Sequence, residues 1–139
     1  MQIRPFRPED TEAVIALWQD AGLTRPWNDP HKDIARKLAV QPELFVVAVD
    51  EDERVIGSVM AGYDGHRGWM NYLAAADDAR GLGVGRALVA HVEAALLALG
   101  CPKVNLQVRS TNSGVVDFYE HLGYRNDDTV SLGKRLIED

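Results

Sequence analysis

A glycine-rich segment, residues 80–85, is the part of this sequence best suited to bind a ligand. It reads Arg-Gly-Leu-Gly-Val-Gly and lies between an expected strand, residues 69–76, and an expected apolar-striped helix, residues 86–99. Glycines let the backbone approach a ligand closely, because no Cβ stands in the way. The first turn of the helix adds unpaired N–H groups and the positive end of the helix dipole. This combination predicts an anion site, most often one for phosphate.

The spacing of the glycines limits which class of phosphate ligand this segment could bind. The dinucleotide fingerprint G-x-G-x-x-G fails, because its last glycine would fall on Arg86 or Leu88. The P-loop pattern fails as well, since Gly133-Lys134 is followed by Arg135 instead of Ser or Thr. The pattern present is R-x-x-G-x-G. A tight turn whose glycines serve packing alone is the alternative to a phosphate site, and a nucleotide-binding protein of another kind is disfavoured.

A second pattern follows downstream, beyond an expected strand at residues 103–108. It has the form N-x-x-A-x-x-x-Y-x-x-x-G-[FY]. Its residues here are Asn112, Val115, Tyr119, Gly123 and Tyr124, and Val115 stands at the position of the small residue in the pattern. In this order the two motifs resemble those of the GCN5-related N-acetyltransferases (GNAT), a family that uses acetyl-CoA. Residues 25–30, 62–68 and 131–135 are similar, more narrowly, to the small bacterial YpeA-type branch of that family.

The resemblance implies an α/β fold with a mixed, mostly antiparallel twisted sheet, helices on both faces and splayed central strands. The hydrophobic pattern fits this plan. It predicts the order β-α-α-β-β-β-α-β-α-β-β, with Asp29-Pro30 starting the second helix, a buried strand at residues 44–49 and a last strand from Thr129 to Ile137. With 139 residues and no linker, we expect one acetyltransferase domain, residues 1–139.

Composition excludes several classes of protein. The net charge of −6 and the absence of a basic face argue against a nucleic-acid partner. No apolar stretch approaches the roughly 20 residues of a membrane span, and the N-terminus lacks the apolar core of a signal peptide. The single cysteine, Cys101, suits a reducing cytoplasm, where we expect this protein to be. No metal-ligand spacing is evident among the histidines. The resemblance leaves a homodimer open.

The resemblance implies that the glycine loop and the strand before it bind the cosubstrate acetyl-CoA. We expect the pyrophosphate to bind the backbone N–H groups of Leu82, Gly83, Gly85 and Arg86, with Arg80 adding side-chain charge. A backbone donor at a strand bulge would face the thioester carbonyl, although the usual proline after the strand is here Asp77. Asn112 would cap its helix and contact the pantetheine arm. The expected binding residues are Leu73, Ala74, Ala75, Arg80, Gly81, Leu82, Gly83, Val84, Gly85, Arg86, Asn112 and Tyr119.

Acetyl transfer to an amine also needs proton transfers. Tyr119 matches the family tyrosine that protonates the departing thiolate, since a phenol with a pKa of ~10 stays protonated at neutral pH. The alternative is that Tyr119 is one aromatic residue of a packed helix face. The expected strand at residues 69–76 contains no carboxylate to serve as general base, so the nearest candidates are His66 and Asp64. These two residues are equally typical of a simple turn.

The acceptor is predicted to be a primary amine, on a small molecule or a peptide, that attacks acetyl-CoA directly in a ternary complex. No cysteine or serine has an evident base partner for a covalent acetyl-enzyme. Trp27, Asn28 and Tyr63 lie in segments that, by resemblance, wall the acceptor site. The alternative function is a non-catalytic acyl-CoA-binding regulatory module, because the strand carboxylate is missing.

Overall fold

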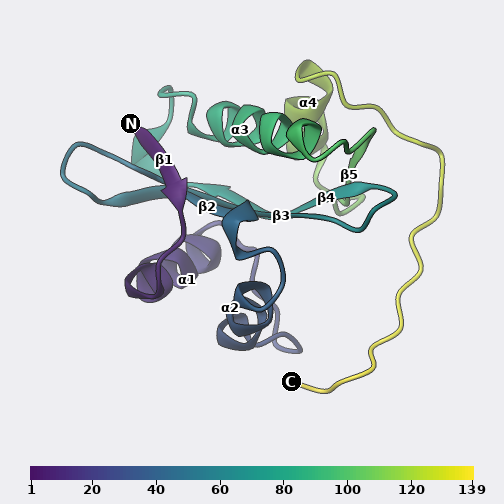
Figure 1. Cartoon of the computed structure of the whole chain (residues 1–139), viewed down its shortest axis with the longest axis horizontal. Helices are drawn as coiled ribbons and strands as arrows, with labels where there is room; N and C mark the ends of the chain where they lie inside the picture. Colours follow the sequence, from purple (N-terminus) through teal and green to yellow (C-terminus); the bar gives the residue numbers. More distant parts are fainter. The chain divides into compact units, whose positions relative to one another are not determined.

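The computed structural model describes residues 1–139 and divides into two compact units: residues 1–105 together with Asp139, and residues 106–138. Figure 1 labels the helices and strands of both units. The elements of the first unit are β1 (Gln2–Pro5), α1 (Thr11–Asp20), α2 (Pro30–Leu38), β2 (Phe45–Val49), β3 (Val55–Tyr63), β4 (Gly68–Ala75) and α3 (Val84–Ala98). Strand β5 (Val104–Leu106) begins in this unit, and α4 (Ser113–His121) belongs to the second. That the whole chain forms one domain stays a prediction.

The sheet is mixed and mostly antiparallel, as predicted, and its strands lie in the order β1-β2-β3-β4-β5. Every residue of β2 is buried, because α1 and α2 cover one face of the sheet and α3 covers the other (Figure 1). The unbroken apolar run that predicted this strand is confirmed. None of the helices is both long and apolar enough to cross a membrane.

Aromatic side chains form the core between the sheet and α1. The ring of Phe45 stacks on that of Phe6, with centroids 4.2 Å apart, and Trp18 is fully buried beside them. The indole Nε1 of Trp18 donates a 2.9 Å hydrogen bond to the hydroxyl of Ser58, which is also fully buried. A buried indole N–H needs such a partner. Helix α1 is therefore held on β3 in one position.

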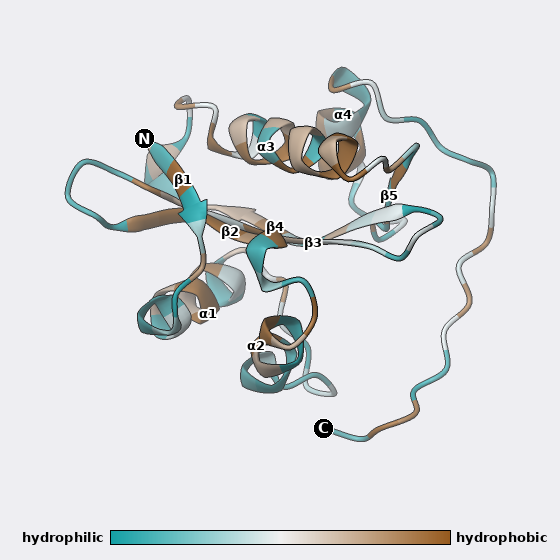
Figure 2. Cartoon of the chain, viewed as in Figure 1, coloured by the Kyte–Doolittle hydropathy of each residue, from teal (hydrophilic) through white to brown (hydrophobic).

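Helix α3 packs its apolar stripe on the opposite face of the sheet, and Figure 2 shows that stripe turned toward the strands. The predicted core positions Leu88, Val92 and Leu96 are buried, whereas Leu99 is exposed because the helix ends at Ala98. A Cβ at Gly57 of β3 would lie 2.5 Å from the side chain of Val84. This glycine therefore lets the first turn of α3 approach the sheet closely.

The second unit contains α4 and an extended tail. The strand predicted from Thr129 to Ile137 is wrong, because residues 125–138 form no strand and the described sheet has five strands. The alternating apolar side chains that suggested a strand are exposed, for example Leu132 and Leu136 at 90% and 87%. Alternation describes a possible face, but a strand forms only where its backbone finds an edge to pair with.

Candidate functional site

The glycine loop connects β4 to α3 and needs glycine for its backbone conformation. Gly81 has φ +85° and Gly83 has φ +70°, values that other residues rarely adopt. A Cβ added at either position would meet no atom within 4 Å. The two glycines therefore do not serve packing, which removes that part of the simple-turn interpretation. Both residues are exposed, so the backbone of the loop is open to a ligand.

The loop leaves a group of backbone N–H donors unpaired. Gly83 is the N-cap of α3, and the N–H of Ala87 is the first to bond inside the helix, at 3.0 Å from the carbonyl oxygen of Gly83. No protein acceptor lies opposite four consecutive N–H groups, those of Gly83, Val84, Gly85 and Arg86. These donors and the helix dipole together favour an anion at this point.

One of the expected donors is already used inside the loop. The N–H of Leu82 donates to the carbonyl oxygen of Ala79 at 3.3 Å, so this N–H is not free, whereas that of Val84 is. The expected set of donors is corrected accordingly, because the loop closes a turn at residues 79–82 before the helix begins. Arg80 is exposed and lies 3.4 Å from Asp77 in an exposed ion pair. Such a pair is weak and can open to let the guanidinium bind a phosphate.

A bulge interrupts β4 just before this loop, where the family resemblance predicts one. The register shifts by one residue, so that Tyr72 and Leu73 lie opposite the single residue Val59 of β3. Tyr72 has φ +55°, the left-handed conformation that glycine usually fills in such a bulge. A bulky residue in this region is strained, typically by about 1–3 kcal/mol, and must be held by its surroundings.

Two contacts hold Tyr72 in the bulge. Its ring stacks on the indole of Trp18, with centroids 3.9 Å apart and planes 13° from parallel. Its hydroxyl donates a 2.7 Å hydrogen bond to Oδ2 of Asp33 in α2. Burial, together with this hydrogen bond and the charge of Asp33, raises the pKa of the Tyr72 phenol. The phenol thus stays protonated and remains a donor at neutral pH.

Sequence reasoning missed both Tyr72 and Asp33 as site residues. They are 39 positions apart, and no motif joins them. The positive φ of Tyr72 follows from the register of β3 and β4, for which the residue itself provides no signal. The carboxylate bonded to the bulge comes from α2, and neither β4 nor its flanking loop provides it.

The structure places Asp64 and His66 at the opposite end of β4 from the bulge. Gly68 pairs with Tyr63 there, while Ala75 pairs with Gly57 near the glycine loop. At roughly 3.3 Å per residue, the five steps along the strand from Gly68 to Leu73 span about 17 Å. The structure thus places Asp64 and His66 away from the bulge, and their role as general base stays a prediction.

The polar groups of this turn bond to one another. Oδ1 of Asp64 accepts hydrogen bonds from the N–H groups of Arg67 at 2.7 Å and His66 at 2.8 Å. These bonds lower the pKa of Asp64, which makes it a poorer base. The hydroxyl of Tyr63 donates to the carbonyl oxygen of Gly65 at 3.3 Å. The turn therefore provides partners for the Asp64 carboxylate and the Tyr63 hydroxyl, as the simpler interpretation of this segment predicts.

The other two acceptor candidates lie between α1 and α2. Trp27 is 54% exposed, and the N–H of Asn28 donates to the carbonyl oxygen of Arg25 at 3.1 Å. Asp29 follows as the N-cap of α2, with its Oδ1 accepting from the N–H of His31 at 2.9 Å. The predicted start of this helix is confirmed. The structure thus places Trp27 and Asn28 directly before the helix that carries Asp33.

The second unit contains Asn112 and Tyr119. Asn112 caps α4, since its Oδ1 accepts from the N–H of Val115 at 3.3 Å. Tyr119 is buried, and burial raises the pKa of its phenol to about 12. Gly123 has φ +95° and ends the helix, and the N–H of Tyr124 donates to the carbonyl oxygen of Tyr119 at 3.0 Å. The rings of these two tyrosines meet edge to face, 5.5 Å apart. Gly123 and Tyr124 of the motif therefore form the C-terminal cap of α4.

The fold is of the α/β class, with a bulged strand followed by a glycine loop that leaves N–H groups unpaired at the start of α3. The family model described as "Acetyltransferase (GNAT) family" matches residues 11–124. The chain belongs to the GNAT family, and it is an acetyltransferase.

Named relatives agree with this assignment. The chain is 53% identical to acetyltransferase ECA0875 of Pectobacterium atrosepticum, over 100% of this chain and 98% of that protein. It is 54% identical to acetyltransferase SG1711 of Sodalis glossinidius, with the same coverage of both chains. Among solved structures, Ard1 of Thermoplasma volcanium is 27% identical with a TM-score of 0.78, covering 88% of this chain and 80% of that one. Chaetomium thermophilum Naa20 in complex with a bisubstrate analogue is also 27% identical, with a TM-score of 0.75, covering 88% of this chain and 70% of that one.

Proposed function

We propose that this protein transfers an acetyl group from acetyl-CoA to a primary amine by direct attack in a ternary complex. The observation that carries the proposal is the run of four unpaired N–H groups from Gly83 to Arg86 at the start of α3. We also propose that the chain belongs to the small bacterial YpeA-type branch, and that it works in the cytoplasm.

The residues of the loop suit a pyrophosphate. Four backbone donors, an open approach at Gly81 and Gly83 and the exposed side chain of Arg80 would together hold a doubly charged group. The helix dipole adds to this attraction. The side of β4 at Leu73 to Ala75 would hold the pantetheine arm, with Asn112 as a further contact.

Acetyl-CoA supplies an activated acyl group with a thiolate leaving group. Leu73, the second residue of the bulge, lies where strand pairing is interrupted, so that a backbone N–H there could face an oxyanion. Such a donor contributes roughly 3–4 kcal/mol to transition-state stability. Tyr119 would give its phenolic proton to the departing sulfur. Its raised pKa of about 12 keeps that proton in place at neutral pH.

Thermal unfolding with and without acetyl-CoA tests the proposal, with CoA, NAD and ATP as comparisons. A ligand at ~100 times its Kd adds ~2.7 kcal/mol to the stability of the folded state, which shifts the Tm of a domain of this size by several degrees. We expect a shift with acetyl-CoA and CoA only. An absent shift at saturating acetyl-CoA would refute the cosubstrate assignment. A shift without acetyl transfer in a screen of amines would favour the non-catalytic module.

A further inference from the structure

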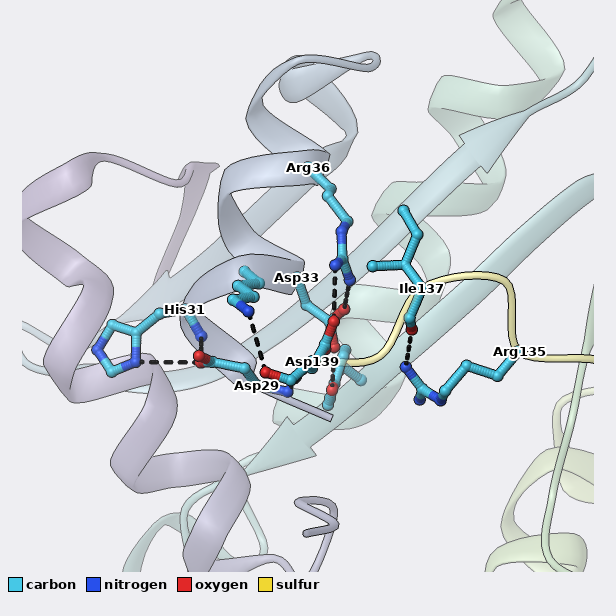
Figure 3. A network of polar contacts seen from close by, with 9 residues as sticks. Asp29, His31, Asp33, Arg36, Arg135, Ile137 and Asp139 are labelled. Atoms are coloured by element: carbon cyan, nitrogen blue, oxygen red, sulfur yellow. Dashed lines mark hydrogen bonds and ion pairs between the residues drawn. The ribbon is translucent and has the colours of Figure 1, made fainter. Parts of the chain in front are cut away.

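The carboxylate of Asp139, the last residue of the sequence, is bound at α2 (Figure 3). Its Oδ1 lies 2.7 Å from the guanidinium of Arg36, and its Oδ2 accepts a 2.9 Å hydrogen bond from the N–H of Asp29. The ammonium of Lys32 donates to the main-chain oxygen of Asp139 at 3.0 Å. Asp139 thus accepts contacts from three donor groups, which all belong to α2 and its N-cap residue.

The side chain of Asp139 is buried, the reverse of what its residue type predicts, whereas the residue taken with its main chain is exposed. Its side chain is 3% exposed, although the apolar side chains of Leu136 and Ile137 shortly before it are 87% and 65% exposed. Removing a carboxylate from water is costly unless it is paired and hydrogen-bonded. The contacts at α2 are therefore the favourable interaction that holds this end of the chain, and apolar packing is not.

The binding groups combine two sources of attraction for an anion. Asp29 caps α2 with its side chain, which leaves its own main-chain N–H directed at the carboxylate of Asp139. The positive end of the helix dipole lies at the same point. Arg36 adds a charge-assisted contact, and it is oriented by a second contact, 3.3 Å from Oδ1 of Asp33.

This anion site is joined to the bulge of β4 by a short chain of contacts. Arg36 lies between Asp139 and Asp33, and Asp33 accepts the hydrogen bond of the Tyr72 hydroxyl at 2.7 Å. A ligand carboxylate at Arg36 would therefore lie close to the bulge.

We propose that the N–H of Asp29, Lys32 and Arg36 form a carboxylate subsite for the acetyl acceptor, which Asp139 occupies in the absence of that acceptor. The inference rests on the proposed acetyl transfer and makes it more specific. The acceptor is then a small amino-carboxylate such as an amino acid. The carboxylate of the acceptor replaces that of Asp139. The ammonium group of the acceptor lies next to the negatively charged Asp33, on the side of the bulge.

A binding experiment tests the subsite without requiring activity. Succinate, a carboxylate with no amine, is titrated by calorimetry into wild type, Asp139→Asn and the matched control Glu138→Gln. Because Asp139→Asn empties the subsite of its competing charge, we expect succinate to bind this variant at least tenfold more tightly than the other two. Adding Arg36→Gln to Asp139→Asn should remove the gain, whereas adding Arg67→Gln, from the far end of β4, should not.

Equal succinate affinity for wild type and Asp139→Asn, with both proteins folded by thermal unfolding, would overturn the proposal and leave Asp139 as a structural tether. Asp139→Ala provides a second variant for the same comparison.

An activity assay separates this inference from the proposed function. L-Ornithine and putrescine differ only by a carboxylate, so we expect acetyl transfer to L-ornithine with a kcat/KM at least tenfold higher, and loss of that preference in Arg36→Gln. Equal transfer to both amines would overturn the carboxylate subsite while the proposed function stands. Succinate binding that depends on Asp139 and Arg36, without transfer to any amine, would leave the subsite standing while the proposed function fails.

Discussion

The two ends of strand β4 contain similar kinds of residues but use their polar groups in different ways. At the start of the strand, the turn after Tyr63 contains Asp64, Gly65 and His66, and its side chains bond to the backbone of the same turn. At the other end, the glycine loop leaves four consecutive N–H groups without a protein partner. The bulge beside that loop holds Tyr72 in a strained conformation.

This difference separates polar groups that bond within the fold from polar groups that are left available to a ligand. A turn that satisfies its own donors and acceptors has no further use for a ligand. An end of the sheet that leaves donors unpaired and stores backbone strain is stable only because other contacts hold it, and such places are typical of binding sites. Residue types alone make His66 an attractive base, whereas hydrogen bonding shows which end of β4 leaves backbone donors unpaired.

The largest effect is expected from Gly83→Val, with Gly65→Val as its matched control. Both glycines have positive φ and open space around a new Cβ, so the backbone strain should be similar, roughly 1–2 kcal/mol. Only Gly83→Val should disturb the free N–H groups. Loss of two charge-assisted hydrogen bonds, each about 1.5–3 kcal/mol, predicts roughly a thousandfold weaker binding of acetyl-CoA by calorimetry. Equal affinity of the two variants would remove the functional distinction between the two ends.

Tyr119→Phe should give the next largest effect, on turnover. Loss of a general acid typically lowers the rate by a factor of 10²–10⁴, so we expect kcat to fall about a hundredfold while the affinity for acetyl-CoA stays within a few-fold. Tyr63→Phe, which removes a hydroxyl at the turn end of β4, serves as a control for folding alone, with an almost unchanged Tm. A fully active Tyr119→Phe enzyme would exclude the phenol from the mechanism.

Tyr72→Phe tests the bulge through stability. The variant keeps the ring on Trp18 but loses the hydrogen bond to the Asp33 carboxylate, which predicts a loss of about 2 kcal/mol in the free energy of unfolding. Denaturant unfolding measures this loss. Tyr63→Phe is again the control, because its hydroxyl bond is long and exposed, and it should cost only a few tenths of a kcal/mol. A similar small cost for both variants would show that Asp33 does not hold the bulge.

The smallest effect on catalysis is expected from Asp64→Ala and His66→Ala. Both variants should keep kcat/KM within twofold of wild type and should keep the same pH–rate profile between pH 6 and 9. Because the folded-state pKa of Asp64 lies below the ordinary value of 3.8, its contribution to stability is present above that pH and is lost as the pH falls through the lower folded value. The stability deficit of Asp64→Ala should thus be seen at neutral pH and shrink in acid. A pH–rate profile altered by either variant would return the base to this turn.

Much of the fold follows from local residue patterns. Asp29-Pro30 marks the start of α2, and the apolar run at residues 44–49 marks the buried strand β2, because caps and burial periodicity act over a few neighbouring residues. The tail from Thr129 to Ile137 shows the limit of such patterns. Its alternation predicts a strand, but strand formation depends on pairing with a distant edge.

By itself, the sequence determined the family, the fold class and the anion loop at residues 80–86, since these depend on glycines, caps and spacings encoded in consecutive residues. Only the tertiary structure decided which end of β4 carries the strained bulge and its long-range contacts. It brought Tyr72 of the bulge onto Trp18 and Asp33, and it set Asp139 against Arg36. These contacts join residues that are far apart in the chain. Because packing and strand register determine them, no local sequence pattern predicts them.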